Sequence, residues 1–160
     1  MNIKKTMALI LAVVCAACLL TACGGGSTSK STSVDVAALA DELNKDTVTT
    51  DTLTETSSDM LPSIYFFKDG QVTESKAYMS SGSTADEICV VKCRDEATTD
   101  DVEKLFQTRV DNQSALYATY KAEESEKLKN AIIKSTGVYT VLVVCDDYSK
   151  ANEILSNYGF

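Results

Sequence analysis

The sequence predicts an α+β fold, with a single globular domain at residues 62–160 in which helices pack on a largely antiparallel sheet of about four strands. Two observations lead to this expectation. Segments with strand character cluster between residues 64 and 93, and segments with helical periodicity follow them. One more strand and a last helix then close the chain, and this order is typical of an α+β domain.

Residues 1–22 have the pattern of a bacterial lipoprotein signal peptide. Two lysines precede an apolar run at 7–20, which is shorter than the roughly 20 residues that a membrane-spanning helix needs. The sequence LTAC at 20–23 resembles a lipobox, in which a branched apolar residue and two small residues precede cysteine. The resemblance implies cleavage before Cys23 and attachment of a diacylglyceryl group to its thiol. An ordinary signal peptide with a chance cysteine is the alternative.

Residues 23–61 are expected to connect the lipidated cysteine to the domain. Gly, Ser and Thr dominate residues 24–33, which indicates a flexible tether. The remainder is poor in large apolar residues apart from one short helical pattern that begins near Asp35. We expect a weak helix there, one that docks on the domain. Its apolar residues are Val34, Val36, Leu39 and Leu43.

Three strands are expected in the first half of the domain. Apolar and aromatic residues occupy 64–67, and an Asp-Gly pair at 69–70 separates them from a second strand at 72–79. This arrangement indicates a hairpin, because the tight turn needs a residue with positive φ. A third strand is expected at 87–93. It is apolar on both faces, which favours a position inside the sheet.

A long helix is expected to start at Thr98 or Thr99, either of which can cap it, with two aspartates in its first turn. A second helix is expected at 123–134, and Gly137 is suited to end it. The apolar stripe of the long helix consists of Val102, Leu105, Phe106, Val110, Leu116, Tyr117 and Tyr120.

The strongest strand signal of the chain lies at residues 138–145. Asp147 can cap a last helix directly after it. The inner face of that helix is expected to carry Ala151, Ile154 and Leu155. The sequence contains no visible internal repeat.

Three short motifs of the domain resemble sequences of a known family. They are ADEI at residues 85–88, Arg109 and Gln113 one turn apart on the long helix, and GVY at 137–139 before an apolar strand. Together they resemble a family of small Gram-positive lipoproteins that is known as a domain of unknown function, over about residues 78–155. The resemblance implies a membrane-anchored, extracytoplasmic setting. It implies no activity and no catalytic residues.

Composition restricts the partners and the chemistry. The sequence has 15 basic and 23 acidic residues; removal of residues 1–22, which contain two lysines and no acidic residue, leaves 13 and 23, a net charge of −10. Such a chain repels nucleic acid, so no nucleic-acid partner is expected. Histidine is absent, which excludes Ser-His-Asp and Cys-His catalysis and His-ligated metal sites. No phosphate loop or dinucleotide motif is present, and no cofactor is expected.

Three cysteines lie in the predicted domain: Cys89, Cys93 and Cys145. Cys89 and Cys93 share one face of one strand about 13 Å apart, which is too far for a disulfide. Cys145 could meet either of them if its strand is the neighbour. We favour three reduced, buried thiols, because their neighbours are apolar and their number is odd. Three thiols without histidine make a poor zinc site.

Acidic pairs at 86–87, 95–96, 100–101 and 146–147 stand at the ends of predicted elements. Adjacent residues on a strand point to opposite faces, so such pairs rarely act as one acid–base pair. Helix capping and surface charge account for most of these pairs. No metal site is predicted, and Asp146 and Asp147 are the best minor candidates for cation binding.

Arg109 and Gln113 are the most informative polar residues. On a helical wheel they lie within about 20° of Val102, one to each side, and so in the centre of the apolar stripe. A charged side chain on the apolar face of a helix must form an ion pair or must reach a water-filled cavity. One interpretation is a structural ion pair with a carboxylate of the sheet, Glu87 or Asp86. The other is a clamp for an anion or carboxylate in a pocket between helix and sheet.

These features together predict a membrane-anchored, extracytoplasmic lipoprotein, held in the membrane by the lipid on Cys23. We expect it to bind a small ligand or an envelope protein without catalysis. The alternative is a small envelope enzyme that uses carboxylates or a thiol, which the absence of histidine and the expected burial of the thiols disfavour. A two-lobed solute receptor is also disfavoured, because about 100 residues cannot easily build two lobes.

Overall fold

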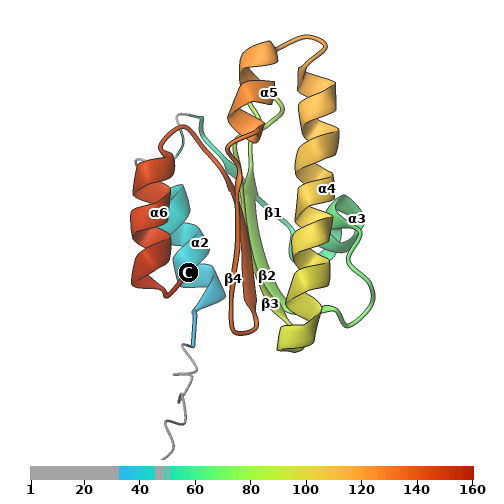
Figure 1. The fold of residues 1–160 in the computed structure, drawn as a ribbon, viewed down its shortest axis with the longest axis vertical. Helices are drawn as coiled ribbons and strands as arrows, with labels where there is room; N and C mark the ends of the chain where they lie inside the picture. The colour runs from blue at the N-terminus through green and yellow to red at the C-terminus, as the bar shows by residue number, and fades with distance from the viewer. Residues whose placement is uncertain (1–32, 46–48, 50) are drawn as a thin grey trace, which may run out of the picture. The chain divides into compact units, whose positions relative to one another are not determined.

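A five-stranded, fully antiparallel sheet lies between two layers of helices (Figure 1). The computed structural model describes residues 33–45, 49 and 51–160. The strands are β1 (Thr54–Thr56), β2 (Val72–Met79), β3 (Glu87–Cys93), β4 (Ile132–Thr136) and β5 (Tyr139–Val144), in the order β1-β2-β3-β5-β4. The helices are α2 (Val36–Asn44), α3 (Leu61–Tyr65), α4 (Thr99–Tyr117), α5 (Ala122–Leu128) and α6 (Tyr148–Asn157), with 3₁₀ turns η1 (Ser58–Met60) and η2 (Glu96–Thr98). The predicted α+β fold with an antiparallel sheet is confirmed.

Helices cover both faces of the sheet, with α2 and α6 on one side and α3, α4 and α5 on the other (Figure 1). Successive side chains of a strand point to opposite faces, so the apolar strands β3 and β5 supply two separate cores. The core beneath α2 and α6 takes Ile88, Val90, Val141 and Val143 from these strands. The core beneath α3 and α4 takes Cys89, Val91, Cys93, Leu142 and Val144. Because β3 is buried on both faces, its side chains are apolar on both faces, and its predicted position inside the sheet is confirmed.

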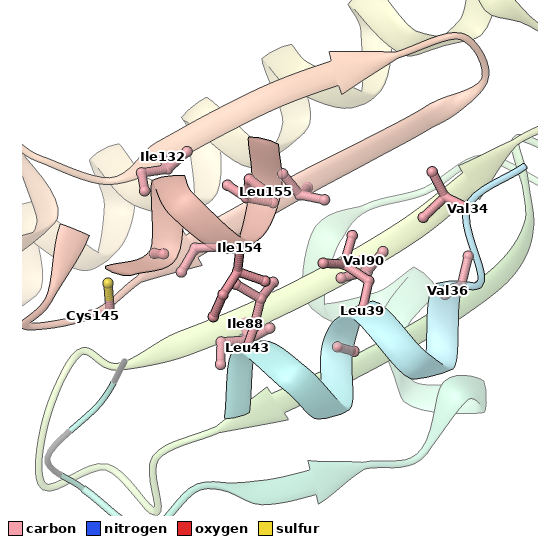
Figure 2. Close-up of a cluster of buried hydrophobic side chains, with 14 of the residues drawn as sticks. Val34, Val36, Leu39, Leu43, Ile88, Val90, Ile132, Cys145, Ile154 and Leu155 are labelled. Atoms are coloured by element: carbon pink, nitrogen blue, oxygen red, sulfur yellow. The ribbon is translucent and has the colours of Figure 1, made fainter. Parts of the chain in front are cut away.

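Helix α2 is an integral part of the first core (Figure 2). The Asp35 carboxylate caps it by accepting a hydrogen bond from the Ala38 N–H at 2.9 Å. Leu39 and Leu43 are fully buried, and burial of one such side chain stabilises a fold by about 1.5–3 kcal/mol. The packed unit therefore extends further toward the N-terminus than the predicted domain start at residue 62.

The predicted strand at 64–67 is wrong, because these residues end a helix. Pro62 stands in the first turn of α3, where its missing N–H costs nothing. Phe66 then adopts a left-handed conformation, with φ 62°, and ends the helix. Gly70, with φ 66°, does form a turn as predicted, but this turn leads from α3 into β2. The neighbours of β2 are β1, which was not predicted, and β3.

The predicted helix at 123–134 is also wrong in its second half. It ends as α5 at Leu128, and β4 begins at Ile132. The reason is tertiary pairing: Ile132 and Ile133 lie opposite Val143 and Leu142 of β5 and extend the buried sheet. Gly137, with φ 53°, therefore turns a hairpin between β4 and β5 and does not end a helix.

The long helix is present as α4, and most of its predicted stripe faces the sheet. Val102, Phe106, Val110 and Tyr117 are buried, but Leu116 and Tyr120 are 52% and 61% exposed. Tyr120 lies beyond the end of α4, where helical periodicity no longer applies. No helix in the described residues has the length and apolar character of a membrane span. The predicted signal peptide, Cys23 and all of the predicted tether at 24–33 except Ser33 lie outside the described residues.

Candidate functional site

A pocket of about 100 Å³ opens where α4 passes the loop between β2 and β3. The pocket brings together the four residues that the sequence suggested for a buried pair or clamp: Asp86, Glu87, Arg109 and Gln113. The remaining lining residues are Met79, Ser80, Gly82, Thr84, Ala85 and Tyr117.

Arg109 reaches from α4 to Glu87, the first residue of β3. Its Nη2 donates to Oε2 at 2.8 Å, and its Nε lies 3.3 Å from Oε1 and 3.2 Å from Oε2. The Glu87 side chain is 7% exposed and that of Arg109 is 23% exposed. Burial lowers the pKa of Arg109, but the hydrogen bonds and the charge of Glu87 outweigh it and raise this pKa above its ordinary value. The Arg109 guanidinium is therefore charged at neutral pH.

Tyr65 holds the same carboxylate from the other side. Its hydroxyl donates to Glu87 Oε1 at 2.7 Å, and the side chain is fully buried. Its ring stacks on Phe67 with centroids 5.3 Å apart and meets the edge of Phe106 at 5.1 Å. Burial raises the pKa of Tyr65, so the hydroxyl stays protonated and remains a donor. The aromatic cluster thus fixes Glu87, and Glu87 fixes one edge of the Arg109 guanidinium.

Arg109 and Gln113 both line the pocket, and each has side-chain donors that no protein group accepts within the described residues. Within the described residues no hydrogen bond uses Arg109 Nη1, and none uses the half-buried side-chain amide of Gln113. No fully buried side-chain nitrogen or oxygen of the described residues lacks a partner, so Arg109 Nη1 and the Gln113 amide are accessible to solvent. The Gln113 side-chain amide therefore has no hydrogen-bond partner within the described residues.

Asp86 lies next to Glu87 in sequence but belongs to a different network. Its Oδ1 accepts from Lys127 Nζ at 3.0 Å and its Oδ2 from Thr84 Oγ1 at 2.8 Å. Asp86 directly precedes β3, and within the described residues its carboxylate contacts Thr84 and Lys127 and forms no ion pair with Arg109. Burial raises the pKa of Asp86, and its hydrogen bonds with Thr84 and Lys127 only partly oppose this shift.

Lys127 joins three carboxylates and anchors the same loop. Besides its contact with Asp86, Lys127 Nζ lies 3.2 Å from Glu124 Oε2 and 2.9 Å from Asp146 Oδ1. Burial lowers the pKa of Lys127, but its hydrogen bonds with Asp146 and Asp86 raise it well above the ordinary value. Glu124 also accepts the Ala85 N–H at 2.8 Å. The ammonium and carboxylates therefore hold the start of β3 in place.

Asp51 and Tyr117 complete the support of the pocket wall. The Asp51 carboxylate accepts from the hydroxyls of Ser80, Ser83 and Thr84, and the first of these hydrogen bonds contributes most to lowering its pKa. The Tyr117 hydroxyl donates to the Thr84 carbonyl at 2.6 Å. Sequence reasoning missed Asp51, Glu124 and Lys127 as site residues, because isolated charged residues carry no signal of a distant partner.

The three cysteines of the domain are buried and unpaired. Cys89 and Cys93 contribute to the core under α4, and Cys145 contributes to the core under α6. Burial raises the pKa of all three thiols, that of Cys145 to about 12. At neutral pH they are therefore thiols and poor nucleophiles.

The two candidates for cation binding have protein partners. Asp146 pairs with Lys127, and Asp147 caps α6 by accepting the Lys150 N–H at 2.8 Å. No cluster of three or more possible metal-ligating side chains occurs among the residues that the structure describes.

A comparison with protein families matches residues 46–145 to the family described as a domain of unknown function (DUF4358). Comparisons with curated proteins and with solved structures gave no match. The matched span runs from before β1 through β5 and includes every lining residue of the pocket. The predicted membership of an uncharacterised family is confirmed, and the chain belongs to the DUF4358 family.

Proposed function

We propose that the chain is a lipid-anchored binding module on the extracytoplasmic face of a Gram-positive cell membrane. The support for the anchor is the LTAC sequence at residues 20–23 after a basic start and a short apolar run. Two acyl chains, each contributing about 0.8 kcal/mol per buried methylene, are sufficient for stable membrane attachment.

The anchor is tested by mass spectrometry of the mature protein. A diacylglyceryl adduct on an N-terminal Cys23 is expected, and Cys23→Ser is expected to accumulate as an unprocessed precursor without the adduct. Cys15→Ser is the matched control, because this cysteine lies in the segment that is removed. Mature protein with an unmodified Cys23 would contradict the lipoprotein proposal.

The binding role depends on one observation: Arg109 and Gln113 line the same pocket, and Arg109 Nη1 and the Gln113 amide have no hydrogen-bond partner within the described residues. Both groups donate hydrogen bonds, so they suit an oxygen acceptor. The pocket volume of about 100 Å³ corresponds to roughly three water molecules, since each occupies about 30 Å³ in the liquid. It therefore accommodates one functional group of a ligand or of a partner's side chain.

The charges select a neutral group over an anion. Glu87 offsets the charge of Arg109, and Lys127 offsets that of Asp86. Asp51 lies behind the loop and adds a negative charge. The site has no positive excess that would attract a free anion, so we propose that its ligand presents an amide carbonyl.

The same geometry supports binding over the enzyme alternative. The carboxylates of Glu87 and Asp86 are each held by a cation and a hydroxyl, and the cysteine thiols are buried with raised pKa values. A general base or a thiolate nucleophile needs an available lone pair near a reacting atom.

The proposal is tested by titrating the full chain with N-methylacetamide and with acetate, observed by NMR. We expect the amide to shift the Ala85 and Glu87 backbone signals more than acetate does, and we expect Gln113→Leu to remove this response. Gln107→Leu is the matched control, because Gln107 is an exposed residue of the same helix. A stronger response to acetate would indicate an anion site. No response to either compound would leave Arg109 and Glu87 as a structural pair and would refute the binding role of the pocket.

A further inference from the structure

Part of strand β2 has a neighbour on one side only. β1 pairs with residues Ala77, Tyr78 and Met79, whereas β3 pairs along the strand from Val72 to Met79. The edge from 72 to 76 therefore has no strand beside it in the described chain. Five residues of strand span about 17 Å, and such an edge presents backbone N–H and C=O groups that can pair with another chain.

A groove of about 530 Å³ lies along this edge. Its lining includes Ser58 and Pro62 together with Glu74 and Ser75 of β2. Phe67 and Val72 add apolar surface to it. We call this the β2 groove. An extended peptide in such a groove can pair with the strand edge while every second side chain contacts the apolar lining.

Two exposed hydrophobic residues lie close in sequence to lining residues of the β2 groove. Met60 is 56% exposed and Phe66 is 67% exposed, and each adjoins or nearly adjoins a lining residue in sequence. Phe66 also has φ 62°, a conformation that costs a non-glycine residue about 1–2 kcal/mol. A large apolar side chain held exposed and strained at this place contributes little to folding, which points to a contact with a partner.

The unpaired carboxylates of the β2 groove favour a basic occupant. Asp69 and Glu74 are exposed and form no ion pair within the described residues, and Lys68 is the one basic lining residue. Lys76 turns away to Asp41 at 2.9 Å and Glu55 at 3.5 Å. A second copy of the chain would fit poorly, because antiparallel pairing centred on Glu74 places this carboxylate opposite its own counterpart.

We propose that the β2 groove binds an extended, basic peptide segment of a partner protein, which adds to β2 as a further strand. This site is separate from the pocket at Arg109, so either proposal can fail alone. Charge complementarity favours a lysine or arginine opposite Glu74, in keeping with the net charge of −8 of the chain.

The experiment begins with a phage-displayed library of random linear heptapeptides, selected on the full chain. The recovered peptides are synthesised and titrated into labelled protein by NMR. We expect enrichment of basic sequences, protection of the amides of residues 73–76 from exchange, and nuclear Overhauser contacts between the peptide and β2. Glu74→Lys should weaken binding about tenfold, as expected for a like-charge contact.

Two control variants test whether peptide binding is specific to the β2 groove. Glu123→Lys makes the same charge change on an exposed residue of α5 and should leave peptide affinity unchanged. Gln113→Leu alters the other pocket and should also leave it unchanged. The proposal is overturned if the selection yields no binder, if the binders lack basic residues or map elsewhere, or if binding occurs without contacts between strands.

Discussion

Substitution of Arg109 by alanine tests the most detailed element of the site. The change removes the guanidinium from a carboxylate that is 7% exposed and leaves Glu87 with the Tyr65 hydroxyl as its hydrogen-bond donor. Breaking a buried ion pair by removing one partner costs about 3–5 kcal/mol. Arg109 is itself 23% exposed, so water can reach part of the space it leaves. We therefore expect the lower end of the range, a loss of about 3 kcal/mol in the free energy of unfolding.

Urea unfolding of the full chain measures this loss, and the sequence offers a matched control. Arg94 is the only other arginine, and its side chain is 62% exposed beside Asp95. Arg94→Ala is expected to cost about 0–1 kcal/mol, as is usual for an exposed pair. In the Arg109→Ala background, Glu87→Gln should restore about 1–2 kcal/mol, because it removes the uncompensated charge. If Arg109→Ala costs no more than Arg94→Ala, and Glu87→Gln restores nothing, the ion pair does not stabilise the fold as argued.

Four further predictions concern other residues of the fold. The domain cysteines should react slowly with iodoacetamide in the native protein and rapidly in urea, because burial raises their pKa values; rapid native labelling of any of them would contradict their burial. Burial raises the pKa of Asp86, so ionisation of this carboxyl disfavours folding as the pH rises above 3.8. Asp86→Asn should therefore be at least as stable as the wild type at pH 7, and any gain in stability should disappear in acid. Burial raises the pKa of Glu124, but the hydrogen bonds from the Ala85 N–H and Lys127 lower this pKa overall. Glu124→Gln should therefore be less stable than the wild type at pH 7, and this loss should shrink as the pH falls below 4.5. Urea melts at several pH values measure both variants, and a stability change of the same sign for Asp86→Asn and Glu124→Gln would refute these assignments. Phe66→Gly should raise the free energy of unfolding by about 0.5–1 kcal/mol, because glycine adopts positive φ without strain, and a loss of more than this would show that Phe66 contributes to packing.

Sequence periodicity predicts the elements whose local pattern agrees with their tertiary setting. The long helix α4 and the strands β2, β3 and β5 carry strong patterns, and the antiparallel α+β architecture follows from their order. β4 was missed because Ile132 and Ile133 also fit the end of a helix, and only pairing with β5 distinguishes the two. β1 was missed because its three residues, Thr54–Thr56, are polar and partly exposed.

The candidate site was predictable in part, because burial of a charge on an apolar stripe is visible in sequence. Arg109 stands out for this reason, and Glu87 was one of two carboxylates suggested as its partner. The network around Lys127 was not predictable, since it joins helix α5 to Asp86, which precedes β3, and to Asp146, which follows β5. Nor could the sequence indicate that the Gln113 amide lacks a hydrogen bond, because that depends on which polar groups surround it in the folded chain.

The central claim is that the Arg109 and Gln113 donors bind an amide carbonyl in the pocket, and their own NMR signals test it most directly. The side-chain ¹⁵N–¹H signals of Arg109 Nη1 and Gln113 Nε2 are recorded while N-methylacetamide is added to the full chain. Donation to a carbonyl oxygen should move both signals together, with one saturating binding curve, while the side-chain amide signal of exposed Gln107 stays in place. If neither Arg109 nor Gln113 responds, or if Gln107 shifts equally, the pocket does not bind such a group and the account of its function is contradicted.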